Sequence, residues 1–265
     1  FLSGTVREFA DGLGIRMSGI AGIGIGILGI GFPSRSPRNN LEKGRDLEAT
    51  LTEVFNTRVR VHHNTKAYTL FEQWANAETR LTDFVWVAIR TGVGTGIIHQ
   101  GQLYAGSHGL AGEIGHLKVV PNGPPCRCGG TGCLETVVNE RYLFQQYTTH
   151  VLRSSSWPAG GEPQQLHEGL QDLFNRSAEG EPQARQVIDT AVGYLGHALA
   201  ATVTVLDINT IVLSGDQIVE PLRHAILSEA LPEVPLRVIY SPFDAQGYVQ
   251  GAALLVLSDY FVDAL

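Results

Sequence analysis

Apolar segments typical of β-strands alternate along the chain with segments whose apolar residues recur at helical spacing. We expect strands at residues 20–30, 58–62, 84–89, 210–213 and 238–240. Apolar residues three or four positions apart predict helices at residues 47–56, 67–80, 135–152, 164–175, 182–206, 219–231 and 251–261. A hairpin is expected to begin at Gly96-Ile97-Ile98 and to turn at Gln100-Gly101. Strands alternating with helices predict an α/β fold with mostly parallel sheets.

A break in this pattern at residues 81–83 is the expected boundary between two lobes. We expect a small front lobe at residues 1–82 and a large lobe beginning at residue 83. Phe1 is the first residue and Met17 is the only methionine, so we expect the front lobe to be incomplete at its N-terminus.

Composition narrows the class of protein. The chain has 265 residues, 43% of them hydrophobic and 17% charged, which is enough to build a sizeable core. Its 19 basic and 26 acidic residues give a formal net charge of −7, which disfavours nucleic-acid binding by this chain itself. No apolar run reaches the ~18–20 residues that a membrane span requires, so we expect no membrane contact and a cytoplasmic location.

The three cysteines lie within eight positions, at Cys126, Cys128 and Cys133. Such close neighbours form a poor disulfide framework, and one would always be left over. The intervening glycines allow the three sulfurs to converge on a metal ion. His116 is the nearest histidine and completes a Cys₃His set, which is typical of closed, structural zinc sites. The alternative is a turn that carries free thiols.

Glycines and carboxylates are the candidates for ligand contacts. Gly92, Gly94 and Gly96 directly follow a predicted strand and could present backbone amides to a phosphate, or could simply form a glycine-rich hairpin. Glu113 and Glu135 flank the proposed metal loop, which would hold both carboxylates in place to accept hydrogen bonds from the hydroxyls of a polyol. The alternative is that both are solvated surface residues.

Two stretches resemble the signature of the ROK family, which groups bacterial sugar kinases with sugar-responsive transcriptional repressors. They are Glu113-Ile114-Gly115-His116 and the run from Cys126 to Glu135. The resemblance implies two ribonuclease H-like (actin-like) lobes around a sugar cleft, with residues 83–250 in the large lobe. It also implies a C-terminal helix, 251–265, that returns to the small lobe, and a homodimer or homotetramer.

By the same resemblance, Asn64, Glu113, His116 and Glu135 line the sugar site. His116 would then bind zinc with one ring nitrogen and face the sugar with the other side of the ring.

The chain departs from the kinase members of the family at three places. Thr65 occupies the position at which the kinase members have the catalytic Asp, and a hydroxyl cannot replace a carboxylate base. An Asp-x-Gly-Gly-Thr phosphate hairpin is absent from the sequence, and Asp216 occupies the expected adenosine loop.

These departures lead to the hypothesis of a sugar-sensing domain of a ROK-type transcriptional regulator, without kinase activity. Such a domain would contact DNA only through a part outside this chain. Two alternatives stay open: a divergent sugar kinase that uses ATP and Mg²⁺, and a zinc-stabilised oligomer that binds no ligand.

Overall fold

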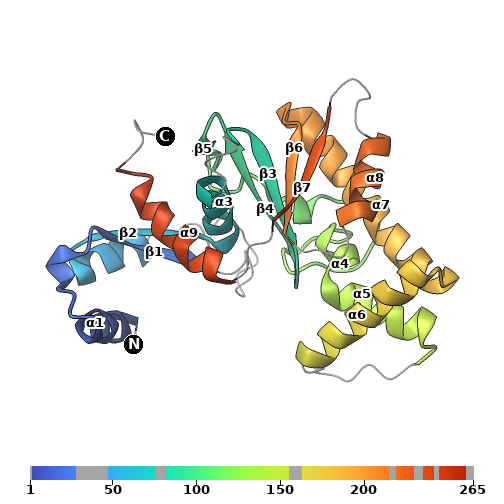
Figure 1. Cartoon of the computed structure of the whole chain (residues 1–265), viewed down its shortest axis with the longest axis horizontal. Helices are drawn as coiled ribbons and strands as arrows, with labels where there is room; N and C mark the ends of the chain where they lie inside the picture. Colours follow the sequence, from blue (N-terminus) through green and yellow to red (C-terminus); the bar gives the residue numbers. More distant parts are fainter. Residues whose placement is uncertain are drawn as a thin grey trace. The chain divides into compact units, whose positions relative to one another are not determined.

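The structure is a computed structural model that describes residues 2–27, 47–75, 81–154, 163–214, 219–229, 235–241 and 245–260. Helices and strands alternate through these residues (Figure 1). The chain divides into two compact units. The first unit comprises Phe1–Thr82, Gly96–Ala111 and Phe243–Leu265, and the second comprises Asp83–Thr95 and Gly112–Pro242. None of the described helices combines the length and the apolar character that a membrane crossing requires.

The first unit is built on two parallel strands. Strand β1 (Gly22–Ile27) pairs with β2 (Arg58–His63) from Gly22 opposite Arg58 to Ile27 opposite His63. Residues 47–55 form a helix whose Leu51 and Phe55 pack with Val59 to form a small core. The other elements of this unit are α1 (Leu2–Gly12), η1 (Met17–Gly19), α3 (Asn64–Ala75), β5 (Gln102–Leu103) and α9 (Ala245–Leu257).

Strand β1 requires glycine at three positions because α9 packs directly against it. A methyl group at Gly22, Gly24 or Gly26 would overlap Val256, the Ala252 carbonyl or the Tyr248 ring, respectively. These three partners are four residues apart and therefore occupy one face of α9. The alternating Ile23 and Ile25 face the core formed with residues 51–59. The Gly-Ile repeat therefore serves two packing surfaces.

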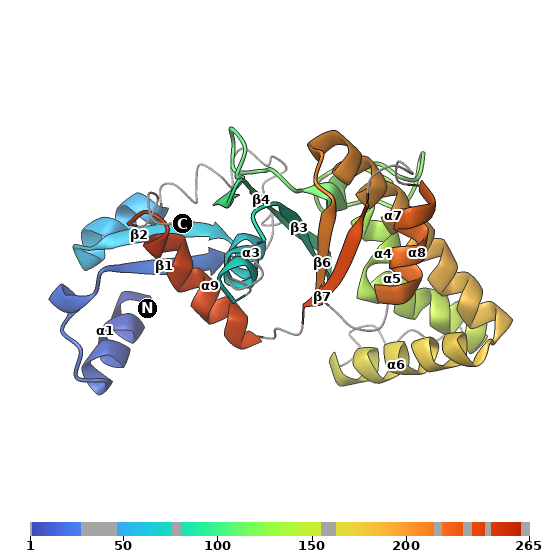
Figure 2. The ribbon, with the colours of Figure 1, turned by 45° about the horizontal axis from the view of Figure 1, so that its top comes forward.

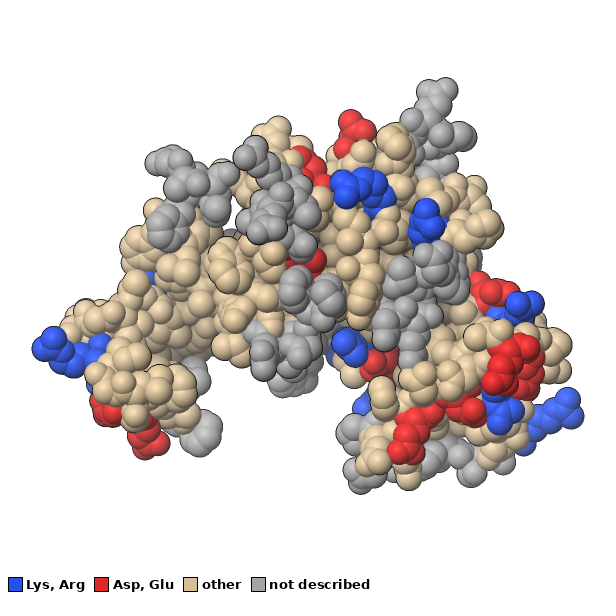
Figure 3. Space-filling model, viewed as in Figure 1, with Lys and Arg blue, Asp and Glu red and all other residues tan. Residues whose placement is uncertain are grey.

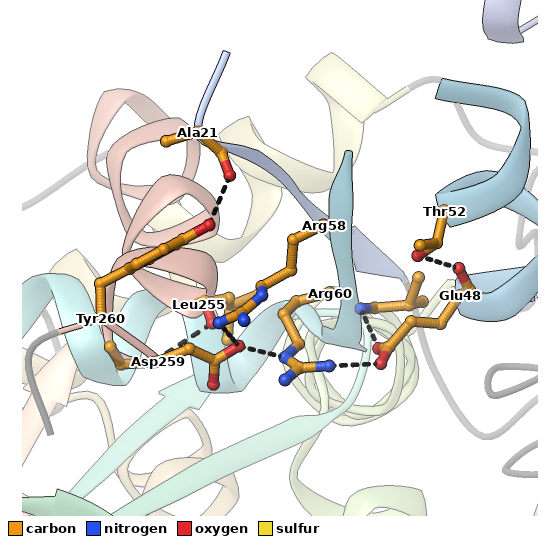
Figure 4. Close-up of polar contacts among 10 residues, drawn as sticks. Ala21, Glu48, Thr52, Arg58, Arg60, Leu255, Asp259 and Tyr260 are labelled. Carbon is orange, nitrogen blue, oxygen red and sulfur yellow. Dashed lines mark hydrogen bonds and ion pairs between the residues drawn. The ribbon is translucent and has the colours of Figure 1, made fainter. Parts of the chain in front are cut away.

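The residues after α9 are joined to β2 by a polar network, which Figure 4 shows. Asp259 Oδ2 accepts hydrogen bonds from Arg60 Nε at 2.6 Å and from Arg58 at 3.4 Å. Arg60 also donates to Glu48 Oε1 at 2.8 Å. The Arg58 guanidinium lies 4.7 Å from the centroid of the Tyr260 ring.

The larger sheet has the strand order β5-β4-β3-β6-β7. Strands β3, β6 and β7 belong to the second unit, β5 belongs to the first, and the division between the units falls within β4. Strands β3 (Phe84–Ile89), β6 (Thr210–Ser214) and β7 (Arg237–Ser241) are parallel, whereas β4 (Val93–His99) and β5 are antiparallel. The expected fold class is confirmed, with a mixed sheet. The hairpin turn at Gln100-Gly101 is also confirmed, and both residues have positive φ.

Helices of the second unit cover one side of β6 and β7. Figures 1 and 2 both show α7 (Pro182–Leu206) and α8 (Val219–Glu229) there, and Gly196 of α7 approaches Ala225 of α8 too closely for a larger side chain. Helix α6 (Pro163–Glu179) follows α5 along the chain. Acidic and basic side chains lie side by side over α6 (Figure 3), among them Arg176 Nε and Asp172 at 2.8 Å.

The prediction of a single helix at residues 135–152 is wrong. The structure has α4 (Glu135–Val138), α5 (Glu140–Gln146) and a π-helical turn, η4 (Tyr147–Val151). Asn139 causes the first break, because its backbone is extended and its side chain accepts a hydrogen bond from Tyr142 N at 2.8 Å. Asn is among the best residues at such a helix N-cap. Helix α1 was not anticipated from the sequence.

Candidate functional site

The four predicted metal ligands converge in the second unit. Their ligand atoms all lie within 4.8 Å of one another. His116 Nδ1 is 3.5 Å from Cys126 Sγ, and the sulfurs of Cys128 and Cys133 are 3.6 Å apart. A tetrahedron with metal–sulfur bonds of about 2.3 Å and a metal–nitrogen bond of about 2.0 Å has edges of about 3.5–3.8 Å. The cluster therefore has the donor set and the spacing to hold a metal ion.

Tight turns bring these ligands together. Cys126 N donates to Gly130 O at 2.8 Å, and isolated β-bridges join Lys118 to Cys133 and Pro125 to Thr131. Gly132 has φ of +69°, and a side chain there would overlap the Val120 carbonyl. The short 3₁₀ turn η3 (Ile114–His116) places the histidine. The loop conformation thus depends on glycine at a position where no other residue fits.

Two carboxylates flank the imidazole of His116, one on each side of the ring. Glu113 Oε2 lies 4.0 Å from Nε2, and Glu135 Oε1 lies 3.9 Å from Nδ1. Glu135 is 6% exposed and also accepts a hydrogen bond from the Cys126 thiol at 3.3 Å. Burial raises the pKa of this thiol, and side-chain hydrogen bonds with Cys128, Glu135 and Cys133 raise it further, against the lowering effect of the backbone hydrogen bond with Cys128. The structure therefore brings Glu113, His116 and Glu135 together beside the metal ligands.

The predicted phosphate-loop glycines have different surroundings. A methyl group on Gly92 would come within 2.8 Å of Glu135 Oε2 and 3.3 Å of the Arg127 guanidinium. A methyl group on Gly96 would overlap Thr69 of α3, so this glycine permits close packing in the first unit. Gly94 is half-buried between them. Thr95 is buried, and its hydroxyl has no hydrogen-bond partner.

Asn64 and Thr65 are the first two residues of α3 and belong to the first unit. Both are half-buried, and Thr65 O accepts a hydrogen bond from the Thr69 hydroxyl at 2.7 Å. The next residue, Lys66, is 1% exposed and donates to the Ala111 carbonyl, two residues before Glu113. Asp216 lies outside the described residues. Lys66 and Arg127 were not predicted from the sequence, although the position of Arg127 between Cys126 and Cys128 is a signal that could have indicated it.

Comparison with known proteins decides the family. The sequence pattern of the ROK family matches residues 1–259. This chain belongs to the ROK family. The ROK protein is 31% identical over 248 residues to a glucokinase of Halalkalibacterium halodurans, covering 86% of this chain and 74% of that one. It is also 31% identical over 138 residues to an N-acetylmannosamine kinase of Shigella boydii, covering 52% of this chain and 43% of the relative.

Solved structures agree on the fold of this ROK protein. A ROK hexokinase from Thermus thermophilus superposes with a TM-score of 0.76 at 24% identity, over 98% of this chain and 85% of the hexokinase. A ROK transcriptional regulator, a homologue of the E. coli MLC protein, gives a TM-score of 0.66 at 28% identity over 81% of this chain and 55% of the regulator. The ribonuclease H-like α/β fold class is thus the one that the sequence predicted.

The expectation of a sugar-sensing regulator domain without kinase activity is wrong. It is overturned by the glucokinase and the N-acetylmannosamine kinase to which the sequence of this chain is similar. A hydroxyl at Thr65 in place of a carboxylate does not by itself exclude kinase activity. Phosphoryl transfer relies mainly on positioning and on stabilisation of charge, so a missing base slows the reaction without removing its other requirements.

Proposed function

We propose that this ROK protein is an ATP-dependent sugar kinase. The observation that carries the proposal is the 31% identity to a glucokinase over 86% of the chain. The identity to an N-acetylmannosamine kinase adds N-acetylated amino sugars to the candidate substrates. The substrate class is therefore a hexose or its N-acetylamino derivative, and the co-substrate is ATP with Mg²⁺.

The carboxylates beside His116 suit a polyol ligand. Glu113 and Glu135 can accept hydrogen bonds from sugar hydroxyls, and Asn64 can both donate and accept. His116 Nδ1 faces the cysteine cluster, whereas Nε2 faces Glu113. Metal binding through Nδ1 would fix the ring and thereby the nitrogen that meets the sugar. Glu113, His116 and Glu135 form the proposed sugar site of the second unit, and Asn64, which belongs to the first unit, is proposed as a further sugar-binding residue.

We propose Zn²⁺ as the metal held by His116, Cys126, Cys128 and Cys133. Three thiolates and one imidazole are a zinc donor set, and four protein ligands complete its tetrahedral coordination. The ion would fold the loop that carries Glu135, and it would take no part in the transfer of phosphate.

Proton removal from the sugar is where this kinase differs from the family pattern. Strand β2 ends at His63, so Asn64 and Thr65 both lie in the first turn of α3. Neither residue is an acid, and absence of a general base typically costs about 10²–10⁴ in rate. We therefore propose that turnover is slow. We also propose that Gly92, Gly94 and Gly96 lie next to the phosphates of ATP. Replacing Asn64 or Thr65 by Asp, in two separate variants, should raise turnover in the variant that restores the base.

The test is a coupled assay of ADP release with glucose, N-acetylglucosamine and N-acetylmannosamine as acceptors. We expect sugar-dependent turnover with at least one of them. Glu113→Gln should lower kcat/KM at least tenfold, because a charge-assisted hydrogen bond is lost. Glu179→Gln, an exposed carboxylate in the same unit, is the matched control and should leave kcat/KM unchanged. Equal activity of the Glu113 variant and the control would remove Glu113 from the site.

We also propose that the kinase acts in the cytoplasm as a homodimer or a homotetramer. Analytical ultracentrifugation of the metal-loaded chain should give twice or four times the mass of the 28.6 kDa protomer. A single species of protomer mass at micromolar concentration would contradict the assembly.

A further inference from the structure

A large cavity lies beside Glu135, within the second unit. Its volume is about 880 Å³, near the upper end of the range for pockets that hold drug-sized ligands. The metal loop, helices α4 and α5, and the turn before β4 form its walls. The lining residues on which the argument depends are Thr91, Arg127, Glu135, Arg141 and Tyr142. A single hexose, with about twelve heavy atoms, would fill only a fraction of this volume.

The lining of this cavity combines polar and apolar groups and has a net positive charge. Its polar groups include hydroxyls from Thr91, Thr136 and Tyr142 and side-chain amides from helix α5 and its N-cap. Two guanidinium groups, from Arg127 and Arg141, stand against one carboxylate, that of Glu135. The positive balance is local, because the chain as a whole has a formal net charge of −7. Such a wall favours an anion over a neutral or apolar ligand.

The two arginines differ in what they already contact. Arg127 is 60% exposed and lies 3.5 Å from Glu135 Oε2, so it partly neutralises that buried carboxylate. Arg141, in the first turn of α5, is exposed and forms no ion pair with any carboxylate in the part of the chain that the structure describes. Its guanidinium is therefore free to bind a ligand, and a planar guanidinium matches the oxygens of a phosphate or a carboxylate.

We propose that this cavity is a subsite for an anionic group, a phosphate or a carboxylate, carried by the sugar substrate. The proposal rests on the kinase function, because Glu135 is shared by the cavity and the proposed sugar site. Arg141 provides the main charge for the anion, and Arg127 orients Glu135 while facing the same group. Sugars that carry a phosphate or a carboxylate would then bind more tightly than the neutral hexoses.

The test measures dissociation constants by titration calorimetry on the metal-loaded full chain. The probes are D-glucose, glucose 1-phosphate, glucose 6-phosphate, glucuronate, inorganic phosphate and ATP. The two sugar phosphates offer the anion from either end of the ring, and glucuronate distinguishes a carboxylate from a phosphate. At least one anionic sugar should bind ten times more tightly than glucose, the factor that corresponds to about 1.4 kcal/mol.

The variant Arg141→Gln should reduce this preference to less than threefold and leave glucose affinity within twofold of the parent. Arg153→Gln, which removes an exposed arginine of the same unit that does not line the cavity, is the matched control and should keep the preference. The proposal would be overturned if none of the anionic sugars bound more than threefold more tightly than glucose. A loss of ATP affinity alone in Arg141→Gln would also overturn it, by assigning the cavity to nucleotide phosphates.

The two proposals fail in different ways. Turnover of neutral sugars without any preference for an anion would contradict the subsite and leave the kinase intact. A calorimetric preference that depends on Arg141, without phosphorylation of any sugar, would contradict the kinase and leave the subsite intact.

Discussion

Gly92 lies at a position where any side chain larger than a hydrogen atom would contact the Glu135 carboxylate. The sequence predicts this glycine to be part of a phosphate loop, and in the structure a Cβ at this position would contact the Glu135 carboxylate and the Arg127 guanidinium. The convergence of His116, Cys126, Cys128 and Cys133 could be predicted from their spacing, because three thiols and a histidine so close in sequence are typical of a metal-binding loop. The surroundings of Lys66 and Arg141 could not be predicted. Neither the burial of the Lys66 side chain nor the lack of an ion pair at Arg141, among the described residues, leaves a signal in the sequence.

Replacing Gly92 by Ala should weaken sugar binding without unfolding the protein. The added methyl group would meet Glu135 Oε2 at 2.8 Å, and the carboxylate at the end of a flexible side chain must move aside. We expect about a tenfold loss of sugar affinity by calorimetry and a melting temperature within about 3 °C of the parent. Gly193→Ala on α7, where nothing lies within 4 Å, should leave the affinity unchanged. Unchanged affinity in Gly92→Ala would place Glu135 outside the sugar site.

His62 should make the first unit sensitive to mild acid. Burial lowers the pKa of His62 below its usual 6.5, and Lys66 and Arg60 lower it further, against the opposing effect of Glu48 and Asp259. The unfolded chain therefore takes up the proton first as pH falls, and the free energy of unfolding decreases below about pH 6.5. Above that pH both states are neutral and the contribution is fully present. Denaturant titrations at pH 7.5 and 5.5 should show that the free energy of unfolding decreases less for His62→Gln than for the parent. Equal decreases in the two proteins would contradict this prediction.

The control is His150→Gln, which replaces an exposed histidine and should behave like the parent.

At the scale of elements, the strand at residues 22–27 could be predicted from the sequence, whereas the identity of the helix that packs on its glycines could not. Alternation of glycine and isoleucine indicates a strand, but the reason for glycine lies in α9, more than two hundred residues away. The break at Asn139 was missed for a related reason. Apolar spacing continues across it, and the capping hydrogen bond to Tyr142 N decides the local backbone.

The contact between β1 and α9 should be intolerant of even one methyl group. Gly24→Ala places that group on the Ala252 carbonyl, a backbone atom that can move only with its helix. We expect a loss of about 1–3 kcal/mol in the free energy of unfolding of the first unit. Gly4→Ala on α1, where nothing lies within 4 Å, should instead gain about 0.5–1 kcal/mol. Similar unfolding midpoints for the two variants would show that α9 does not pack on β1 as described.

At the scale of the whole molecule, the family and the fold class could be predicted because the metal-loop motif is long and specific. The function could not, because the prediction depended on which residues were missing. A base at Thr65 is one contribution among several in phosphoryl transfer, and its absence does not distinguish a slow kinase from a protein that has lost the activity.

Removal of the metal should affect folding before it affects chemistry. Cys128→Ser should lower bound zinc from about one ion per chain to near zero, as measured by atomic emission, because three ligands bind zinc far more weakly than four. Unfolding of the second unit should also become less cooperative. Ser177→Ala on α6 is a control that should keep the metal. A Cys128→Ser protein that retains stoichiometric zinc would exclude this ligand set.

The most direct measurement is detection of the product by ³¹P NMR after incubation of the zinc-loaded chain with ATP, Mg²⁺ and a panel of neutral and anionic sugars. We predict a new sugar-phosphate resonance that grows in step with ADP and depends on the sugar. If ATP stayed intact, or fell to ADP and inorganic phosphate at the same rate with and without sugar, the protein would not be a sugar kinase.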